Sequence, residues 1–224
     1  MSVKITAATM PIGENTDGCQ TPQEYLVWAA RVSNPGNQSN HETGERLLKY
    51  CIRKRHWSIF DMVDISMEIR CPRDISRQIL RHRSFCFQEF SQRYAVPDLD
   101  EIEPRDTRMQ DVKDRQSSLP CEDPSLVEEW DLLQAEVMQE IAKVYEWAIK
   151  AGIAKECARV ILPEGLTESV LVMKGSVRSW IHYCEVRRAP ETQAEHREIA
   201  NLCWGQLRTV VPLVCQAVEE VAGE

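Results

Sequence analysis

Residues 73–93 read RDISRQILRHRSFCFQEFSQR, a segment that combines helical spacing, dense positive charge and aromatic residues. Its first half has helical spacing. Arg73, Arg77 and Arg81 recur at every fourth residue and so share one face of the predicted helix. Like charges placed in this way repel one another unless an anion compensates them. Asp74 is expected to offset part of this charge, but one carboxylate cannot offset three arginines, so the segment predicts an anionic ligand.

The second half of the segment combines charged and aromatic side chains. Three potential cations follow one another at residues 81–83. Glu89, Ser91 and Arg93 then alternate, so in an extended chain they would point to one side and offer groups suited to phosphate. The interleaved aromatic residues favour a buried or interface position: Phe85, Phe87, Phe90 and Tyr94. Two alternatives stay open, a solvated basic helix face and an internal salt-bridge network.

The composition of the whole chain narrows the classes of function. The 224 residues carry a net charge of -8, which argues against general affinity for nucleic acid, whereas a local arginine cluster favours a small anionic ligand. We find neither a long apolar run nor the features of a signal peptide. We therefore expect no membrane partner and a cytoplasmic location, the host cytoplasm if the protein is viral. The nine cysteines form no CxxC pair, which favours reduced thiols and no metal site.

Hydrophobic periodicity predicts a helix-rich α+β fold in one domain, residues 1–224, with a small antiparallel or mixed sheet. The predicted strands are residues 3–9, 62–69 and 166–175. The predicted helices are residues 21–33, 41–54, 73–82, 124–150, 153–161, 176–187 and 193–222, the last broken at Pro212. Residues 95–123, rich in proline and charge, are expected to form a loop excursion.

Several blocks of the chain resemble the family of flavin-dependent thymidylate synthases. The signature of that family is Arg-His-Arg followed by seven residues and Ser, present here as RHR at 81–83, SFCFQEF and Ser91. Other blocks resemble family motifs in the same order: AARVS at 29–33, HWSIF at 56–60, ARVILP at 158–163, and SVRS at 176–179 followed by His182 and Arg187. The wording MKGSVRSWIHY resembles viral members. Gln88, Ser176 and His182 depart from the pattern, because family members often have asparagine at the first two places and some have it at the third.

The resemblance implies the α+β fold of that family and an enzyme that converts dUMP to dTMP. Methylenetetrahydrofolate would donate the carbon, FAD would supply the hydride and NADPH would reduce the flavin. The active form would be a homotetramer with sites shared between subunits.

The resemblance also implies which residues form the site. Contacts to FAD are expected from Ser33, His56, Ser58, Arg81, His82, Arg83, Glu89, Ser176, Arg178 and His182. Binding of dUMP is expected from Arg77, Gln78, Arg81, Glu89, Phe90, Ser91, Gln92, Arg93, Arg159 and Arg187. Arg187 would be the catalytic residue, because a guanidinium beside the uracil ring stabilises negative charge there.

Three further residues, and the function of the whole chain, allow more than one interpretation. Ser91 is interpreted as a binding donor, since a serine nucleophile needs an activating base. Cys86 lies between two phenylalanines and is interpreted as a packed thiol. His196 is interpreted as a surface residue or a partner of nearby acids. The alternative functions are a flavin-binding relative without synthase activity and a non-catalytic RNA-binding protein. The chain has no GxGxxG motif, so a Rossmann site for the nicotinamide cofactor is not expected.

Overall fold

The computed structural model describes residues 1–99 and 104–223 and has an α+β architecture. One antiparallel sheet has the order β1-β2-β6-β3, and β4 and β5 form a separate two-stranded pair. The strands are β1 Ser2–Ala8, β2 Asp64–Pro72, β3 Cys86–Glu89, β4 Arg108–Gln110, β5 Ser118–Pro120 and β6 Glu168–Ser176. The α-helices are α1 Pro22–Ala30, α2 Gly44–Arg53, α3 Arg73–Ile79, α4 Pro124–Lys150, α5 Lys155–Ala158, α6 Val177–Arg187, α7 Ala194–Val210 and α8 Pro212–Gly223. The 3-10 helices are η1 Gly13–Asn15, η2 Pro35–Asn37, η3 Trp57–Asp61 and η4 Arg159–Ile161.

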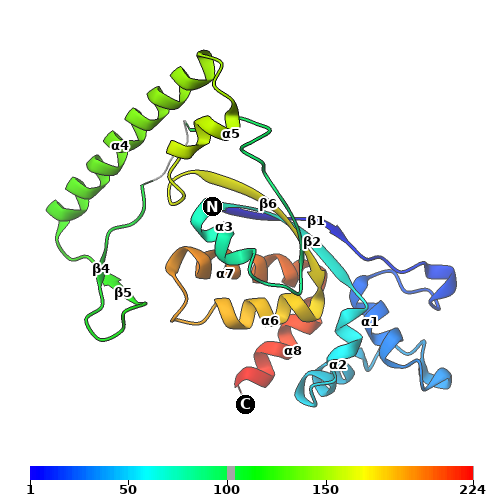
Figure 1. Cartoon of the computed structure of the whole chain (residues 1–224). Helices are drawn as coiled ribbons and strands as arrows, with labels where there is room; N and C mark the ends of the chain where they lie inside the picture. The colour runs from blue at the N-terminus through cyan, green and yellow to red at the C-terminus, as the bar shows by residue number, and fades with distance from the viewer. Residues whose placement is uncertain (100–103, 224) are drawn as a thin grey trace.

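Strand β2 explains why the sheet has one buried face. Apolar residues alternate through the predicted strand 62–69, which puts Val63, Ile65, Met67 and Ile69 on one side, and all four are at most 1% exposed. Helices α6, α7 and α8 lie on that side of the sheet (Figure 1). The indole Nε1 of Trp180 on α6 donates a hydrogen bond of 3.0 Å to the carbonyl of Ile65, so the helix is fixed in register on the sheet. The predicted half-buried strand is therefore confirmed.

Helix α4 stands apart from the sheet (Figure 1). Its start is local in origin: the Asp123 side chain accepts hydrogen bonds from the backbone N–H groups of Ser125 and Leu126, and Pro124 occupies the first turn. The predicted bounds 124–150 are confirmed. A small cluster of Tyr145 and Ala148 with Ala158 of α5 buries part of one face, whereas much of the remaining apolar surface is exposed. Across residues 1–99 and 104–223, no helix is both long and apolar enough to span a bilayer.

The predicted excursion at 95–123 contains the β4–β5 pair and is anchored to the rest of the protein; residues 100–103 lie outside the described residues. Both terminal nitrogens of Arg105 donate to the carboxylate of Asp74, at 3.0 and 3.1 Å. The expectation that Asp74 offsets the arginine face of α3 is therefore wrong. Its two oxygens are taken by an arginine from the excursion, a pairing that helical spacing cannot reveal.

Three local expectations of burial are wrong. Helical spacing in the predicted helices 21–33 and 41–54 puts Val32 and Tyr50 among the apolar, buried positions. They are instead 65% and 49% exposed, because α1 ends at Ala30 and Tyr50 lies on the outer side of α2. Cys86, interpreted as a packed thiol, is an exposed free cysteine. Strand alternation is the reason: Phe87 pairs with the buried Met173, so its neighbour Cys86 points to the opposite face.

Candidate active site

Arg187 and His82 form a pair between the end of α6 and the turn after α3. The Nε of Arg187 donates a hydrogen bond of 2.9 Å to Nε2 of His82, so this ring nitrogen acts as an acceptor. Burial, followed by the charges of Arg187, His182 and Arg81, lowers the pKa of His82 to about 4. The ring is therefore uncharged at neutral pH, and it holds the guanidinium of Arg187 in place while leaving its other N–H groups free to bind a ligand.

His196 lies behind this pair and is fully buried, so its interpretation as a surface residue is wrong. Its Nδ1 lies 3.2 Å from Oε1 of Gln78, and its Nε2 lies 3.2 Å from the hydroxyl of Tyr183. Burial, together with the charge of Arg187 and the neighbouring His82, lowers the pKa of His196 to about 3. The neutral His196 thus connects Gln78, which is predicted to bind dUMP, with the interior of the fold.

Glu89 joins α3 to the sheet. Its Oε1 accepts hydrogen bonds of 2.9 Å from the hydroxyls of Ser76 and Ser169, and its Oε2 accepts one of 2.9 Å from Arg77. Arg73 is buried, and its Nε donates to Glu164 at 3.2 Å. For Arg73 and Arg77 the alternative of an internal salt-bridge network is therefore correct. This network consolidates the wall of the site.

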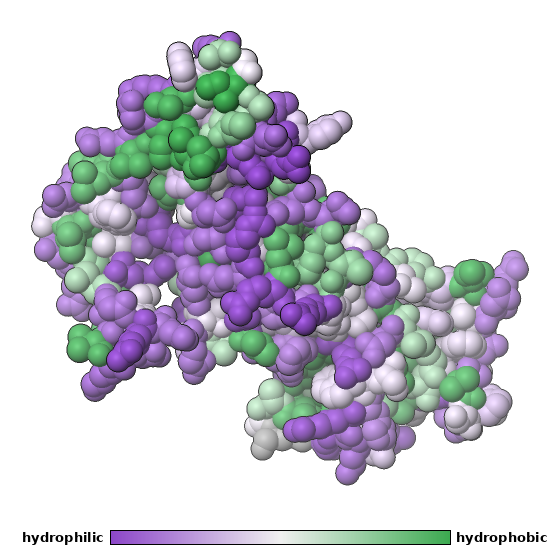
Figure 2. Space-filling model, viewed as in Figure 1, coloured by the Kyte–Doolittle hydropathy of each residue, from purple (hydrophilic) through white to green (hydrophobic). Residues whose placement is uncertain are grey.

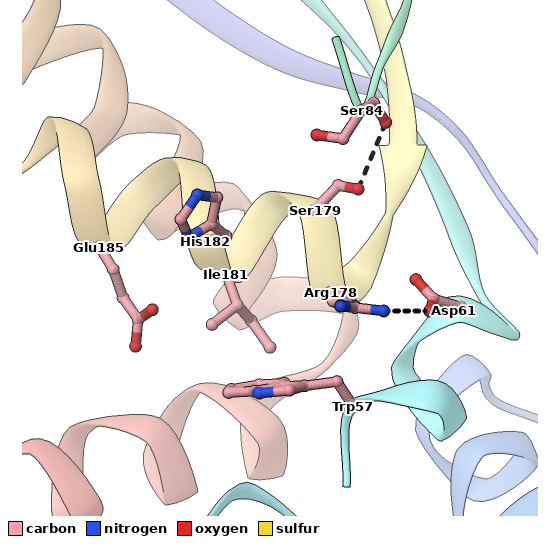
Figure 3. Close-up of a pocket in the computed structure, with 8 residues that line it drawn as sticks. All are labelled: Trp57, Asp61, Ser84, Arg178, Ser179, Ile181, His182 and Glu185. Atoms are coloured by element: carbon pink, nitrogen blue, oxygen red, sulfur yellow. Dashed lines mark hydrogen bonds and ion pairs between the residues drawn. The ribbon is translucent and has the colours of Figure 1, made fainter. Parts of the chain in front are cut away.

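A cleft of about 460 Å³ opens beside the start of α6 (Figure 3). Its lining residues are Trp57, Asp61, Ser84, Arg178, Ser179, Ile181, His182 and Glu185. The indole of Trp57 lies across the cleft from Ile181, and Arg178 points to Asp61, to which it donates a hydrogen bond of 3.0 Å. The cleft therefore offers an aromatic face and a guanidinium to the same ligand.

Several of the residues expected to bind FAD gather around this cleft. Arg178 and His182 line it, and the hydroxyl of Ser176 caps α6 and donates to Asp61 at 2.8 Å. His56 and Ser58 flank the lining residue Trp57 and are exposed. The signature residues Arg81, His82 and Arg83 precede the lining residue Ser84. Ser33 is exposed in the turn after α1 and does not belong to the lining.

The residues expected to bind dUMP lie in two places. Gln78 and Arg187 lie near His82, whereas Ser91 and Arg93 line a separate hollow with residues 94 and 154–156. Arg93 donates to Glu156 there at 3.1 Å. Arg159 is half-buried at the start of η4, and Phe90 continues the sheet through a hydrogen bond from its N–H to the carbonyl of residue 170.

The expected one-sided display of Glu89, Ser91 and Arg93 is wrong. Strand β3 ends at Glu89, and the chain then turns, with the N–H of Tyr94 bonded to the carbonyl of Ser91 at 2.9 Å. Glu89 consequently faces α3 while Arg93 faces α5. Gln92 is buried, and its Nε2 has no hydrogen-bond partner.

Sequence reasoning missed several residues of the site. Trp57 and Ser179 stood inside the quoted motifs HWSIF and SVRS without an assigned role, and Asp61 and Glu185 were not considered. One signal was available for His196: it is spaced by three, seven and eleven residues from the buried Ile199, Cys203 and Leu207, which places it on the inner face of α7.

The uncharged state of the two buried histidines makes stability depend on pH. Their folded pKa values, about 4 for His82 and about 3 for His196, lie below the ordinary value of 6.5, so the unfolded chain binds more protons below that pH. The stabilisation is complete above about pH 6.5 and is lost as the pH falls toward the folded pKa values. We expect the free energy of unfolding, measured with urea, to decrease from about pH 7 to about pH 5. The decrease should be shallower in His196→Asn. A flat profile in the wild type, or a decrease that is equally steep in both proteins, would contradict this account.

The chain is similar to known proteins both in sequence and in fold. A family model described as thymidylate synthase complementing protein matches residues 16–213. A probable flavin-dependent thymidylate synthase of Paramecium bursaria Chlorella virus 1 is 43% identical over 221 residues, which cover 99% of this chain and 100% of that protein. A flavin-dependent thymidylate synthase of Synechocystis is 48% identical over 199 residues, covering 89% of this chain and 90% of the relative.

A solved structure shares the fold. The UMP/dUMP methylase PolB from Streptomyces cacaoi, crystallised with 5-Br dUMP, superposes with a TM-score of 0.78 over 98% of this chain and 94% of that one, at 23% identity. At this level of identity the similarity supports the α+β architecture alone. The assignment to a family rests on the family model and the sequence relatives.

Proposed function

Because the chain belongs to the family of flavin-dependent thymidylate synthases, enzymes that methylate dUMP to dTMP, we propose that Arg187 acts on the uracil ring of dUMP. In this proposal methylenetetrahydrofolate donates the carbon and NADPH reduces the FAD. The observation that carries the proposal is the pairing of Arg187 with an uncharged His82, which leaves a fixed guanidinium at the end of α6.

We propose that the cleft of Figure 3 receives the flavin. Trp57 offers an aromatic face to a conjugated ring, and Arg178 and His182 are suited to the anionic part of FAD. The remaining residues proposed to hold FAD are His56, Ser58, Glu89, Ser176 and the signature residues Arg81, His82 and Arg83; Ser33, which lies outside the lining of this cleft, is proposed to contact FAD beyond it. When bound, FAD supplies the hydride, and the protein supplies placement and charge.

We propose that dUMP binds at both of the places described above, its ring near His82 and its phosphate in the hollow lined by Ser91 and Arg93. Arg187 and Gln78 contact the nucleotide near His82. Ser91, Gln92, Arg93 and Arg159 hold its phosphate, because bidentate guanidinium groups match phosphate geometry. Arg77, Glu89 and Phe90 support this wall, since Arg77 is already paired with Glu89 and Phe90 is bonded to the sheet.

The chemistry proposed for Arg187 is electrostatic. A guanidinium beside the imide of uracil stabilises negative charge on the ring, so the 5-position becomes more nucleophilic. His82 keeps this guanidinium oriented, and because the His82 ring is uncharged it does not compete for the anion. The exposed Cys86 points away from the core face that Phe87 occupies, and we assign it no role as a nucleophile.

We further propose that the active form is a homotetramer, with α4 in a subunit interface. Figure 2 shows apolar side chains along this helix. They are separated alternately by four and three residues, apart from Glu140: Leu126, Trp130, Leu133, Val137, Val144 and Trp147. Each is between 39% and 64% exposed. This spacing is typical of a helix that packs along a partner helix.

A charge placed on this stripe is expected to separate the subunits. Val137→Glu should lower the mass of the particle in solution, as measured by light scattering, because an unpaired carboxylate would be buried in the interface. Gln139→Glu adds the same charge two residues away, outside the stripe, and should leave the mass unchanged. Equal masses for wild type and Val137→Glu would contradict the assignment of α4 to the interface.

The decisive test of the function uses the purified chain reconstituted with FAD. With labelled dUMP, methylenetetrahydrofolate and NADPH in the absence of oxygen, tritium should be released from the 5-position and dTMP should form. The flavin absorbance should bleach on addition of NADPH. A yellow protein that bleaches but releases no tritium would instead be the flavin-binding relative without synthase activity, and a protein that takes up no FAD would refute the proposal.

A further inference from the structure

A continuous row of hydrogen bonds crosses the interior behind the candidate nucleotide site. The hydroxyl of Tyr183 lies 3.2 Å from Nε2 of His196, and Nδ1 of His196 lies 3.2 Å from Oε1 of Gln78. The Nε2 of Gln78 donates to Oε1 of Gln193 at 2.7 Å, and the Nε2 of Gln193 donates to Oε2 of Glu195 at 2.9 Å. The row thus connects α6, α3 and α7 through side chains alone.

The carboxylate at one end sets the direction of every bond in the row. Glu195 is buried, and its Oε1 accepts a hydrogen bond of 2.6 Å from Arg108 of β4, so its Oε2 accepts from the amide nitrogen of Gln193. The oxygen of Gln193 therefore faces the amide nitrogen of Gln78, and the oxygen of Gln78 faces His196. His196 must then carry its proton on Nδ1 and accept at Nε2 from the hydroxyl of Tyr183.

This direction matters because a glutamine amide has two ends of nearly equal shape. If the amide of Gln78 were to rotate by half a turn, its donor and acceptor would exchange places, and a ligand would meet the wrong group. The row opposes the exchange at both ends, since a rotated Gln78 would set its oxygen against the oxygen of Gln193 and its nitrogen against the Nδ1–H of His196. One N–H and one lone pair of the amide remain for a ligand, in fixed positions.

We propose that His196 is a positioning residue that orients the amide of Gln78 toward the nucleotide, and that Gln193 holds the other end of this amide. The inference rests on the proposed function, in which Gln78 contacts dUMP. It also gives a role to the excursion at 104–120, because Arg108 of β4 holds the carboxylate at which the row ends.

The test measures the dissociation constant of dUMP for the FAD-loaded protein. His196→Leu removes the donor and should weaken dUMP binding by about tenfold, the effect of losing one hydrogen bond to a buried partner. His196→Asn places an amide N–H where Nδ1 lies and should recover most of the affinity. The FAD content of both variants should remain that of the wild type, because no residue of the row lines the flavin cleft.

A double variant separates positioning from general damage to the fold. If His196 acts through Gln78, then His196→Leu combined with Gln78→Ala should bind dUMP no more weakly than Gln78→Ala alone. Gln193→Leu changes a half-buried position and should weaken dUMP binding by a factor similar to that of His196→Leu. If His196→Leu fails to fold, the dUMP affinity of Gln193→Leu tests the inference in its place.

The outcomes that would overturn the inference are distinct from failure of the proposed function. Wild-type affinity in His196→Leu or in Gln193→Leu would overturn it, as would independent, multiplying losses in the double variant. A wild-type protein that binds FAD but no dUMP would instead refute the proposed function, before any variant is compared.

Discussion

Arg187→Ala in the FAD-loaded protein is expected to lower the rate of dTMP formation by roughly 100- to 1,000-fold, the effect of removing one preorganised donor from a developing anion. The guanidinium is held by the 2.9 Å hydrogen bond from its Nε to His82, so its position does not have to be established during the reaction. The flavin should remain bound, because the cleft of Figure 3 is lined by other residues of α6. Tritium release from labelled dUMP measures the rate, and flavin absorbance measures the occupancy.

The neighbouring arginine provides a matched control. Arg188 donates to Asn201 at 3.0 Å and stacks on the ring of Trp204 at 5.0 Å, outside the candidate site. Arg188→Ala removes the same chemical group one residue later and should retain activity. Arg187→Lys keeps the charge but loses the planar donor set, so its activity should lie between those of wild type and Arg187→Ala. Full activity in Arg187→Ala would show that the guanidinium has no part in the reaction.

Elements with a local cause could be predicted from the sequence. Helix α4 begins at the residue indicated by Asp123 and Pro124, and it is followed by Gly152, whose φ of +81° lies in the left-handed region that favours glycine. The alternation in β2 also predicted its buried face. In both cases residues within a few positions of one another determine the outcome, which is why a single sequence was sufficient.

The partners of the site residues could not be predicted in this way. Asp74 pairs with Arg105, which is 31 residues away, and Arg77 pairs with Glu89 across the turn that contains the signature. The sequence presented all of these as charged residues in need of a partner, but only the three-dimensional fold determines which charges meet. The resemblance to a family predicted the residue types of the site, whereas the row behind Gln78 depends on where α7 packs.

Gly175→Ala is expected to lower the free energy of unfolding by about 1–3 kcal/mol, the typical cost of inserting a methyl group into a filled core. A Cβ at Gly175 would lie 2.4 Å from Cδ1 and 2.6 Å from Cε1 of Phe85, closer than nonbonded carbons can approach. Phe85 cannot move aside freely, because it is buried and its ring lies 4.8 Å from that of Trp180. Urea unfolding measures the loss.

A second glycine shows what the same substitution does where there is space. Gly205 lies exposed in α7 with nothing within 4 Å of its would-be Cβ, so Gly205→Ala should stabilise the protein by about 0.5–1 kcal/mol through helix propensity. If contact with Phe85 causes the loss at Gly175, then Gly175→Ala should cost less in a Phe85→Leu background than in the wild type. An equal cost in both backgrounds would mean that the backbone, and not the ring, makes glycine necessary there. Because Phe85 follows Ser84, which lines the candidate flavin cleft, a displaced ring should also weaken FAD binding in Gly175→Ala but not in Gly205→Ala.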